Sequence, residues 1–217
     1  MIRILALVAA MGVFPMSADA TSLDGQGTYD LLFRTGTLDE IDRGTALVYE
    51  RETSNTLLPA AEARDNGEIA LAFDKAQEEL AVLEFRQGDK HRGLGRFPAS
   101  VGNPMIMYFY ETVIRDMAEA AGGSPFYIRN RVKEALVTPS EAVEGEAMVD
   151  GHKIATQTIV LRPFEGDPNR DRMQGFGDLE MRVVMSDDVP GWYLAFTAEA
   201  ADVYSTNLQF SRQEPGQ

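Results

Sequence analysis

The sequence predicts an α+β fold in which a curved antiparallel β-sheet, shaped like a half-barrel, packs on a central two-helix hairpin. Segments with alternating apolar and polar residues lie on both sides of the middle of the chain. The middle itself, residues 103–138, has apolar residues at helical spacing. Alternation indicates a sheet with one dry face, and the two helices are the long apolar elements available to cover it.

Residues 1–20 are predicted to be a signal peptide and not part of the fold. Arg3 provides a short positive start, and an uncharged apolar run too short to span a bilayer follows it. Ala18-Asp19-Ala20 has the small-x-small pattern of a cleavage site. We therefore expect cleavage after Ala20 and a periplasmic protein. The sequence shows no second hydrophobic span, so stable membrane insertion is not expected.

Residues 21–217 are predicted to form a single β-rich domain, because this length suffices for one core. The chain has no cysteine, so packing alone must hold it in an oxidising compartment, as in a bacterial periplasmic protein. It carries 20 basic and 34 acidic residues, a net charge of −14. This charge argues against nucleic acid as a partner and against attraction to a bare anionic membrane.

Before the helices, four segments have a strand-like pattern. The polar segment 51–66, broken by Pro59, is interpreted as a loop. Gly93-Leu94-Gly95 and Pro98 are interpreted as a break in the chain ahead of the helices. The last two of the four segments are predicted to form a hairpin. The predicted strands are residues 28–33, 45–50, 69–73 and 81–85.

The two central helices have clear start and stop signals. Asn103 is a suitable N-cap, and Pro104 fits the first helical position, where its missing N–H costs nothing. Gly122-Gly123 supplies a left-handed stop. Ser124-Pro125 repeats the start signal, and Thr138-Pro139 ends the second helix.

The first helix is apolar around most of its first two turns, well beyond one face. One interpretation is a core helix covered by the sheet. The other is a lid over an apolar cavity between helix and sheet, for which adaptable methionines are suited. On the second interpretation the candidate ligand-binding residues are Met105, Met107, Tyr108, Phe109 and Tyr110.

After the helices the alternation is more regular. Asp187 to Gly191 is predicted to be a turn, and the tail after Arg212 is predicted to fray. The acidic residues of segment 141–146 are interpreted as solvated charges in turns or at strand edges. The predicted strands are residues 154–161, 179–185, 192–199 and 204–210. The side chains expected to face the core are Met185, Trp192, Leu194, Phe196 and Phe210.

The order of strands, helix pair and strands resembles the half-barrel of LolA/LolB-type periplasmic lipoprotein and lipid carriers. It also resembles related exported bacterial proteins of unknown function. The resemblance covers residues 21–217 as an order of elements, with the Asn103-Pro104 and Ser124-Pro125 helices in the middle. It implies an enclosed surface between sheet and helices that takes acyl chains, and it transfers no individual binding residue.

The sequence predicts no catalytic site, no metal site and no cofactor. It contains no cysteine and no Gly-x-Ser-x-Gly motif, and His91 and His152 stand beside lysines in polar, turn-like segments. Residues Asp167 to Asp178 follow part of a calcium-loop pattern, but Arg172 stands where the loop needs a glycine. We interpret that segment as an ordinary acidic loop.

Taken with the resemblance, these features favour an exported, non-catalytic protein that binds or carries a lipid or another apolar ligand. The alternative is a structural or assembly partner of the cell envelope that has no small-molecule ligand. Such a protein would use the polar face of the sheet or the basic second helix. A hydrolase is a second alternative, which the missing nucleophile motifs disfavour.

Overall fold

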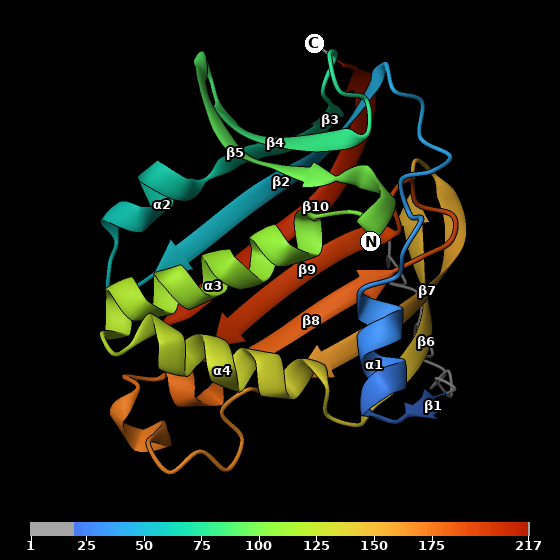
Figure 1. The fold of residues 1–217 in the computed structure, drawn as a ribbon. Helices are drawn as coiled ribbons and strands as arrows, with labels where there is room; N and C mark the ends of the chain where they lie inside the picture. Colours follow the sequence, from blue (N-terminus) through green and yellow to red (C-terminus); the bar gives the residue numbers. More distant parts are fainter. Residues whose placement is uncertain (1–19, 217) are drawn as a thin grey trace, which may run out of the picture.

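A ten-stranded antiparallel sheet runs through the molecule, with strands β1 and β5 at its two edges (Figure 1). The computed structural model describes residues 20–216. The strand order is β1-β6-β7-β8-β9-β10-β2-β3-β4-β5. The strands are β1 (Ala20–Leu23), β2 (Thr45–Asn55), β3 (Gly67–Phe73), β4 (Leu80–Gln87), β5 (Lys90–Pro98), β6 (Ser140–Val149), β7 (His152–Leu161), β8 (Glu180–Met185), β9 (Tyr193–Ala200) and β10 (Tyr204–Pro215). The predicted signal peptide lies outside the described residues except for Ala20, which begins β1.

The helices gather on one side of the sheet. Figure 1 shows α3 and α4 lying along the same face. The helices are α1 (Gly25–Leu32), α2 (Ala60–Asp65), α3 (Met105–Ala121) and α4 (Pro125–Leu136). Short 3-10 turns occur at Ala99–Val101, Arg170–Arg172 and Phe176–Asp178. The broad prediction, a mainly antiparallel sheet accompanied by a few helices, is confirmed.

The core lies between α3 and the sheet. The Phe109 ring of α3 lies 5.1 Å from the Phe196 ring of β9, which in turn lies 4.8 Å from Tyr193. Apolar side chains of the strands from β2 to β4 and from β7 to β10 are buried in the same cluster. The five side chains predicted to face the core are all buried. Burial of this large apolar surface is the main term that stabilises the fold.

The predicted hairpin of β3 and β4 is confirmed. Ile69 lies opposite Phe85 and Leu71 opposite Leu83, so each apolar pair shares one face. The four strands predicted after the helices are β7, β8, β9 and β10. The turn predicted after β8 is also present, closed by a 2.9 Å hydrogen bond from Ser186 N to Trp192 O.

The strand predicted at residues 28–33 is wrong, because this segment belongs to helix α1 and its C-terminal end. The Asp24 carboxylate caps the helix by accepting a 2.7 Å hydrogen bond from Gly27 N. Tyr29 and Phe33 alternate as strand residues would, but they are also four residues apart. In the helix their rings stack at 4.6 Å on one face, so a spacing of four residues is compatible with both a strand and a helix.

The loop predicted at residues 51–66 is also wrong. Strand β2 continues to Asn55, and α2 occupies much of the remainder. In the sequence the segment looks like a loop because it is polar. In the structure, every second polar side chain of β2 points into the protein interior. Arg51 pairs there with Asp116 at 3.0 Å, and Thr53 bonds to another threonine hydroxyl on β10 at 2.9 Å. Buried polar groups need such partners, which the sequence does not reveal.

Two further segments form strands where none was predicted. Residues 93–98 do not break the chain but belong to edge strand β5. The acidic residues of segment 141–146 are exposed, as expected, yet they belong to β6, which pairs with β1 and β7. The tail after Arg212 continues β10 as far as Pro215, which lies opposite Thr45 of β2. The frayed tail is therefore corrected to a paired strand.

Candidate functional site

A groove of about 820 Å3 lies over the outward face of α3. In Figure 1, β4 and β5 run along one side of α3 and α4 along the other. The volume falls within the range of small-molecule sites, about 300–1,000 Å3. The lining is mainly apolar, and it includes the side chains of Leu83, Leu94, Phe97, Met107, Tyr108 and Ile114. The site therefore suits an apolar ligand.

A β-bulge shapes the wall of the groove that β5 provides. Leu83 pairs with Gly95 and the next residue of β4 pairs with Gly93, so Leu94 is the extra residue. A bulge of this kind redirects a side chain, and Leu94 lines the groove. A Cβ on Gly95 would lie 2.8 Å from the Phe97 ring, so glycine allows that ring to pack against the strand. The segment interpreted as a chain break thus forms a wall of the site.

The structure separates the five candidate residues into two groups. Met107, which is 46% exposed, and the half-buried Tyr108 line the groove. Met105, Phe109 and Tyr110 are buried in the core that joins α3 to the sheet. Burial raises the pKa of the Tyr110 phenol, and no residue of the described chain forms a hydrogen bond with its hydroxyl. The groove therefore involves the outward face of α3, whereas the sequence pointed to the inward face.

Asn103 fixes the start of α3 and so the position of Met107. Its side-chain oxygen accepts a 3.0 Å hydrogen bond from Met105 N, so it caps the helix start as expected, although the N-cap position falls on Pro104, one residue later than predicted. Its amide nitrogen donates to Gly191 O at 2.9 Å and to the Tyr49 hydroxyl at 3.3 Å. The helix is therefore anchored to the sheet at the end next to Met107.

Paired charges border the apolar lining. Arg129 of α4 donates two hydrogen bonds to the Glu111 carboxylate, at 2.8 and 2.6 Å. Arg64 of α2 does the same to Glu119, at 2.8 and 3.0 Å. These hydrogen bonds lower the pKa of each carboxyl group. Both glutamates therefore stay ionised near neutral pH.

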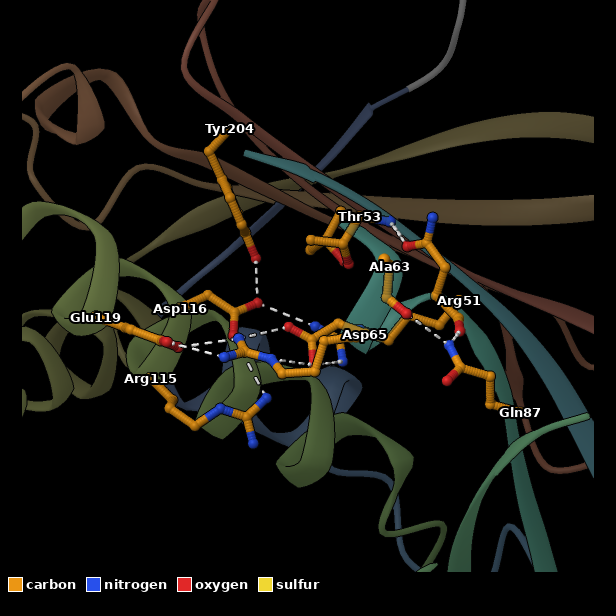
Figure 2. Close-up of polar contacts among 12 residues, drawn as sticks. Arg51, Thr53, Ala63, Asp65, Gln87, Arg115, Asp116, Glu119 and Tyr204 are labelled. Carbon is orange, nitrogen blue, oxygen red and sulfur yellow. Dashed lines mark hydrogen bonds and ion pairs between the residues drawn. The ribbon is translucent and has the colours of Figure 1, made fainter. Parts of the chain in front are cut away.

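A buried ion cluster lies next to the groove, at the end of α3 (Figure 2). Arg51 of β2 donates to an oxygen of Asp116 at 3.0 Å, and the Tyr204 hydroxyl donates to the same oxygen at 3.0 Å. Asp65 of α2 lies 4.0 Å from the Arg51 guanidinium. Arg51 is 2% exposed and Asp116 is 4% exposed, so the pair is held away from water. The cluster joins α2, α3, β2 and β10.

The two carboxyl groups of this cluster shift in opposite directions. Burial raises the pKa of Asp116, and this effect outweighs the lowering by the nearby Arg51 and Arg115 charges and by the Tyr204 hydrogen bond. Burial also acts upward on Asp65, but there the hydrogen bonds from Arg64 and the surrounding arginine charges prevail, so the pKa of Asp65 is lowered. The Asp116 carboxylate thus depends on Arg51 for much of its stability.

The residues singled out for chemistry are engaged in local contacts. His91 Nδ1 lies 3.1 Å from a Glu84 carboxylate oxygen. Asp167 accepts hydrogen bonds from the Tyr127 hydroxyl, at 2.7 and 2.8 Å, and Asp178 pairs with Arg170. Within residues 20–216, no three histidine or acidic side chains gather in a way that could hold a metal ion.

Sequence reasoning missed the second wall of the groove and the ion cluster. The signal for the wall was Phe97 after Gly93-Leu94-Gly95, a pattern that also fits a bulged strand. Arg51 and Asp65 lay in the segment interpreted as a loop. No local signal shows that such charges are buried, because their partners come from distant elements.

No family model matches the chain, and no curated protein matches it. Among solved structures, the chain is similar to the crystal structure of the lipoprotein LppX of Mycobacterium tuberculosis. The sequence identity is 12% and the TM-score is 0.37. The match covers 88% of this chain and 98% of that one, and the likeness is one of general architecture.

No helix in residues 20–216 combines the length and the apolar character needed to cross a membrane.

Proposed function

We propose that the protein binds an apolar ligand with an acyl-like chain in the groove over α3, without converting it chemically. The proposal rests on the apolar lining of the groove. Its base and walls are formed by Leu83, Leu94 and Phe97 of the sheet and by Ile114 of α3, whereas Met107 stands at its surface. Methionine is flexible and polarizable and suits a surface that adapts to chains of different shape.

The expected driving force is burial of methylene groups. Each buried methylene contributes about 0.8 kcal/mol, so a chain of ten contributes roughly 8 kcal/mol. Loss of translational freedom and ordering of the chain reduce this figure by several kcal/mol. The result is reversible binding of moderate affinity, which suits a carrier or a sensor.

The absence of catalysis is part of the proposal. Glu111 and Glu119 lie at the groove, but each is held ionised by a bidentate arginine. A general acid must carry a proton at the working pH, and a lowered pKa opposes this. Their surroundings support a role in structure over a role in proton transfer.

Export is also part of the proposal, on the pattern of residues 1–20. N-terminal sequencing of protein purified from a periplasmic extract should read Thr21-Ser22-Leu23-Asp24. Retention of Met1 on a protein found in the cytoplasmic fraction would contradict it.

Met107→Glu should weaken binding of N-phenyl-1-naphthylamine, an uncharged fluorescent probe of apolar sites, by at least about tenfold. A carboxylate placed over an apolar lining must be desolvated when the probe binds, which costs free energy. The measurement is a fluorescence titration of both proteins at neutral pH. Because Met107 is at the surface, the folding free energy should change by only about 0.5 kcal/mol.

The matched control is Met148→Glu, the same exchange at an exposed methionine of β6, which does not line the groove. It should leave probe binding unchanged. If the wild-type protein binds no probe, or if both variants weaken binding equally, the groove is not a ligand site. The alternative role as an envelope partner protein would then be favoured.

A further inference from the structure

Arg115 is one of the residues that line the groove. It lies on the outward face of α3, four residues after Glu111 and eight after Met107, so all three side chains follow one ridge of the helix. Its side chain is 52% exposed. An arginine here can contact both the groove and the solvent.

The guanidinium of Arg115 is more loosely paired than its neighbours. Within residues 20–216, the Arg115 guanidinium donates a hydrogen bond to the Asp116 carboxylate at 3.4 Å. The other oxygen of Asp116 already accepts from Arg51 and from Tyr204. By contrast, Arg129 binds its glutamate through two short hydrogen bonds. Since a guanidinium carries five N–H donors, Arg115 retains donors for another acceptor.

The two glutamates at the groove do not cancel this charge. Arg129 binds Glu111 and Arg64 binds Glu119, each through both carboxylate oxygens. The net charge of −14 opposes any anion at long range. At physiological ionic strength this repulsion is screened beyond about 8 Å, whereas direct contact with Arg115 is not. An apolar lining beside the guanidinium lowers the local dielectric and strengthens such a contact.

We propose that Arg115 binds the anionic head group of a single-chain amphiphile, a carboxylate or a phosphate, while the chain lies along the apolar groove. This inference rests on the proposed function and adds the chemical class of the ligand. A planar guanidinium matches both carboxylate and phosphate oxygens and can bind either through two parallel hydrogen bonds. Arg115 thus determines which apolar molecules are preferred.

The test measures displacement of N-phenyl-1-naphthylamine by three ligands with the same twelve-carbon chain. They are laurate, dodecyl phosphate and uncharged 1-dodecanol. The wild-type protein should bind at least one of the two anions more tightly than the alcohol. In Arg115→Gln this preference should fall by roughly 10- to 100-fold, as expected for loss of a charge-assisted hydrogen bond. Affinity for the uncharged alcohol and for the probe should fall far less than affinity for the anion.

Two control variants separate contact from general charge and from stability. Arg115→Lys keeps the charge but lacks the planar guanidinium that can form two parallel hydrogen bonds. It should retain part of the preference for the anion. Arg182→Gln removes an equally exposed arginine on β8, far along the sheet from β5, and should change nothing. Because Arg115 also contacts the buried Asp116 carboxylate, Arg115→Gln should lower the thermal midpoint slightly, and binding is therefore measured well below that midpoint.

The outcomes separate the two proposals. If the probe does not bind the wild type, the proposed function fails. If the probe binds but the three ligands compete equally in wild type and in Arg115→Gln, the groove stands and the head-group site is wrong. If Arg182→Gln lowers the preference as much as Arg115→Gln, the effect is one of net charge and the inference is also wrong. The ratio of laurate to dodecyl phosphate distinguishes a carboxylate from a phosphate ligand.

Discussion

Replacing Arg51 with methionine should destabilise the protein by about 3–5 kcal/mol at neutral pH, the usual cost of leaving a buried charge unpaired. Arg51 is the residue that holds the Asp116 carboxylate in the interior, at 3.0 Å. Burial already raises the pKa of Asp116 while Arg51 is present, and removal of Arg51 takes away the largest opposing effect. Urea denaturation monitored by circular dichroism measures the loss.

The loss should shrink as the pH falls. The pKa of Asp116 is already raised above the ordinary aspartate value of 3.8 when Arg51 is present, and loss of Arg51 should raise it further, so the folded variant takes up the proton more readily than the unfolded chain. Acidification towards that folded pKa therefore neutralises the unpaired charge. A loss that is equally large at pH 7 and pH 4.5 would show that the cost comes from packing and not from charge.

Two companion variants sharpen this result. Arg51→Met combined with Asp116→Asn should recover part of the lost stability, because no charge is then left unpaired. Arg162→Met removes an arginine whose side chain is 54% exposed and whose partner, Glu180, is itself partly exposed, and it should cost about 1 kcal/mol or less. If both single variants cost the same, burial does not determine the effect.

Phe196→Ala should also cost about 3–5 kcal/mol, the usual range for loss of a buried aromatic ring. Phe196 is 0% exposed and packs between Phe109 and Tyr193, so the cavity cannot close without moving α3 or the sheet. Phe126→Ala, the same exchange at an exposed site on α4, should change stability by about 0.5 kcal/mol or less. A loss below about 1 kcal/mol for Phe196→Ala would mean that β9 does not present this side chain to the core.

The sequence was sufficient for elements whose pattern is local. Ile69, Leu71 and Phe73 alternate along β3 and face the core together, as a period of two requires. Asn103 was recognised as the residue whose side chain caps the start of α3, to within one position, because capping involves residues only two or three positions apart. Such signals are short-range, and the structure agrees with them.

The sequence failed where distant partners decide the structure. Tyr29 and Phe33 satisfy both a strand and a helix period, and the Asp24 cap decides in favour of the helix. From the sequence alone, Arg51 would be expected to lie in solvent. It is buried because Asp116, on another element, pairs with it. Of the residues that line the groove, Met107 and Tyr108 were among the predicted candidates, whereas Leu94 and Phe97 were not, because the groove depends on how an edge strand lies beside a helix.

Strand β10 joins the two parts of the sheet. On one side it pairs with β9, the last of the strands β6 to β9, which also carry β1 at their far edge. On the other side it pairs with β2, the first of the strands β2 to β5. Without residues 204–215 the molecule would consist of two separate ladders, and the two halves of the chain can be joined into one sheet only once its last segment is in place.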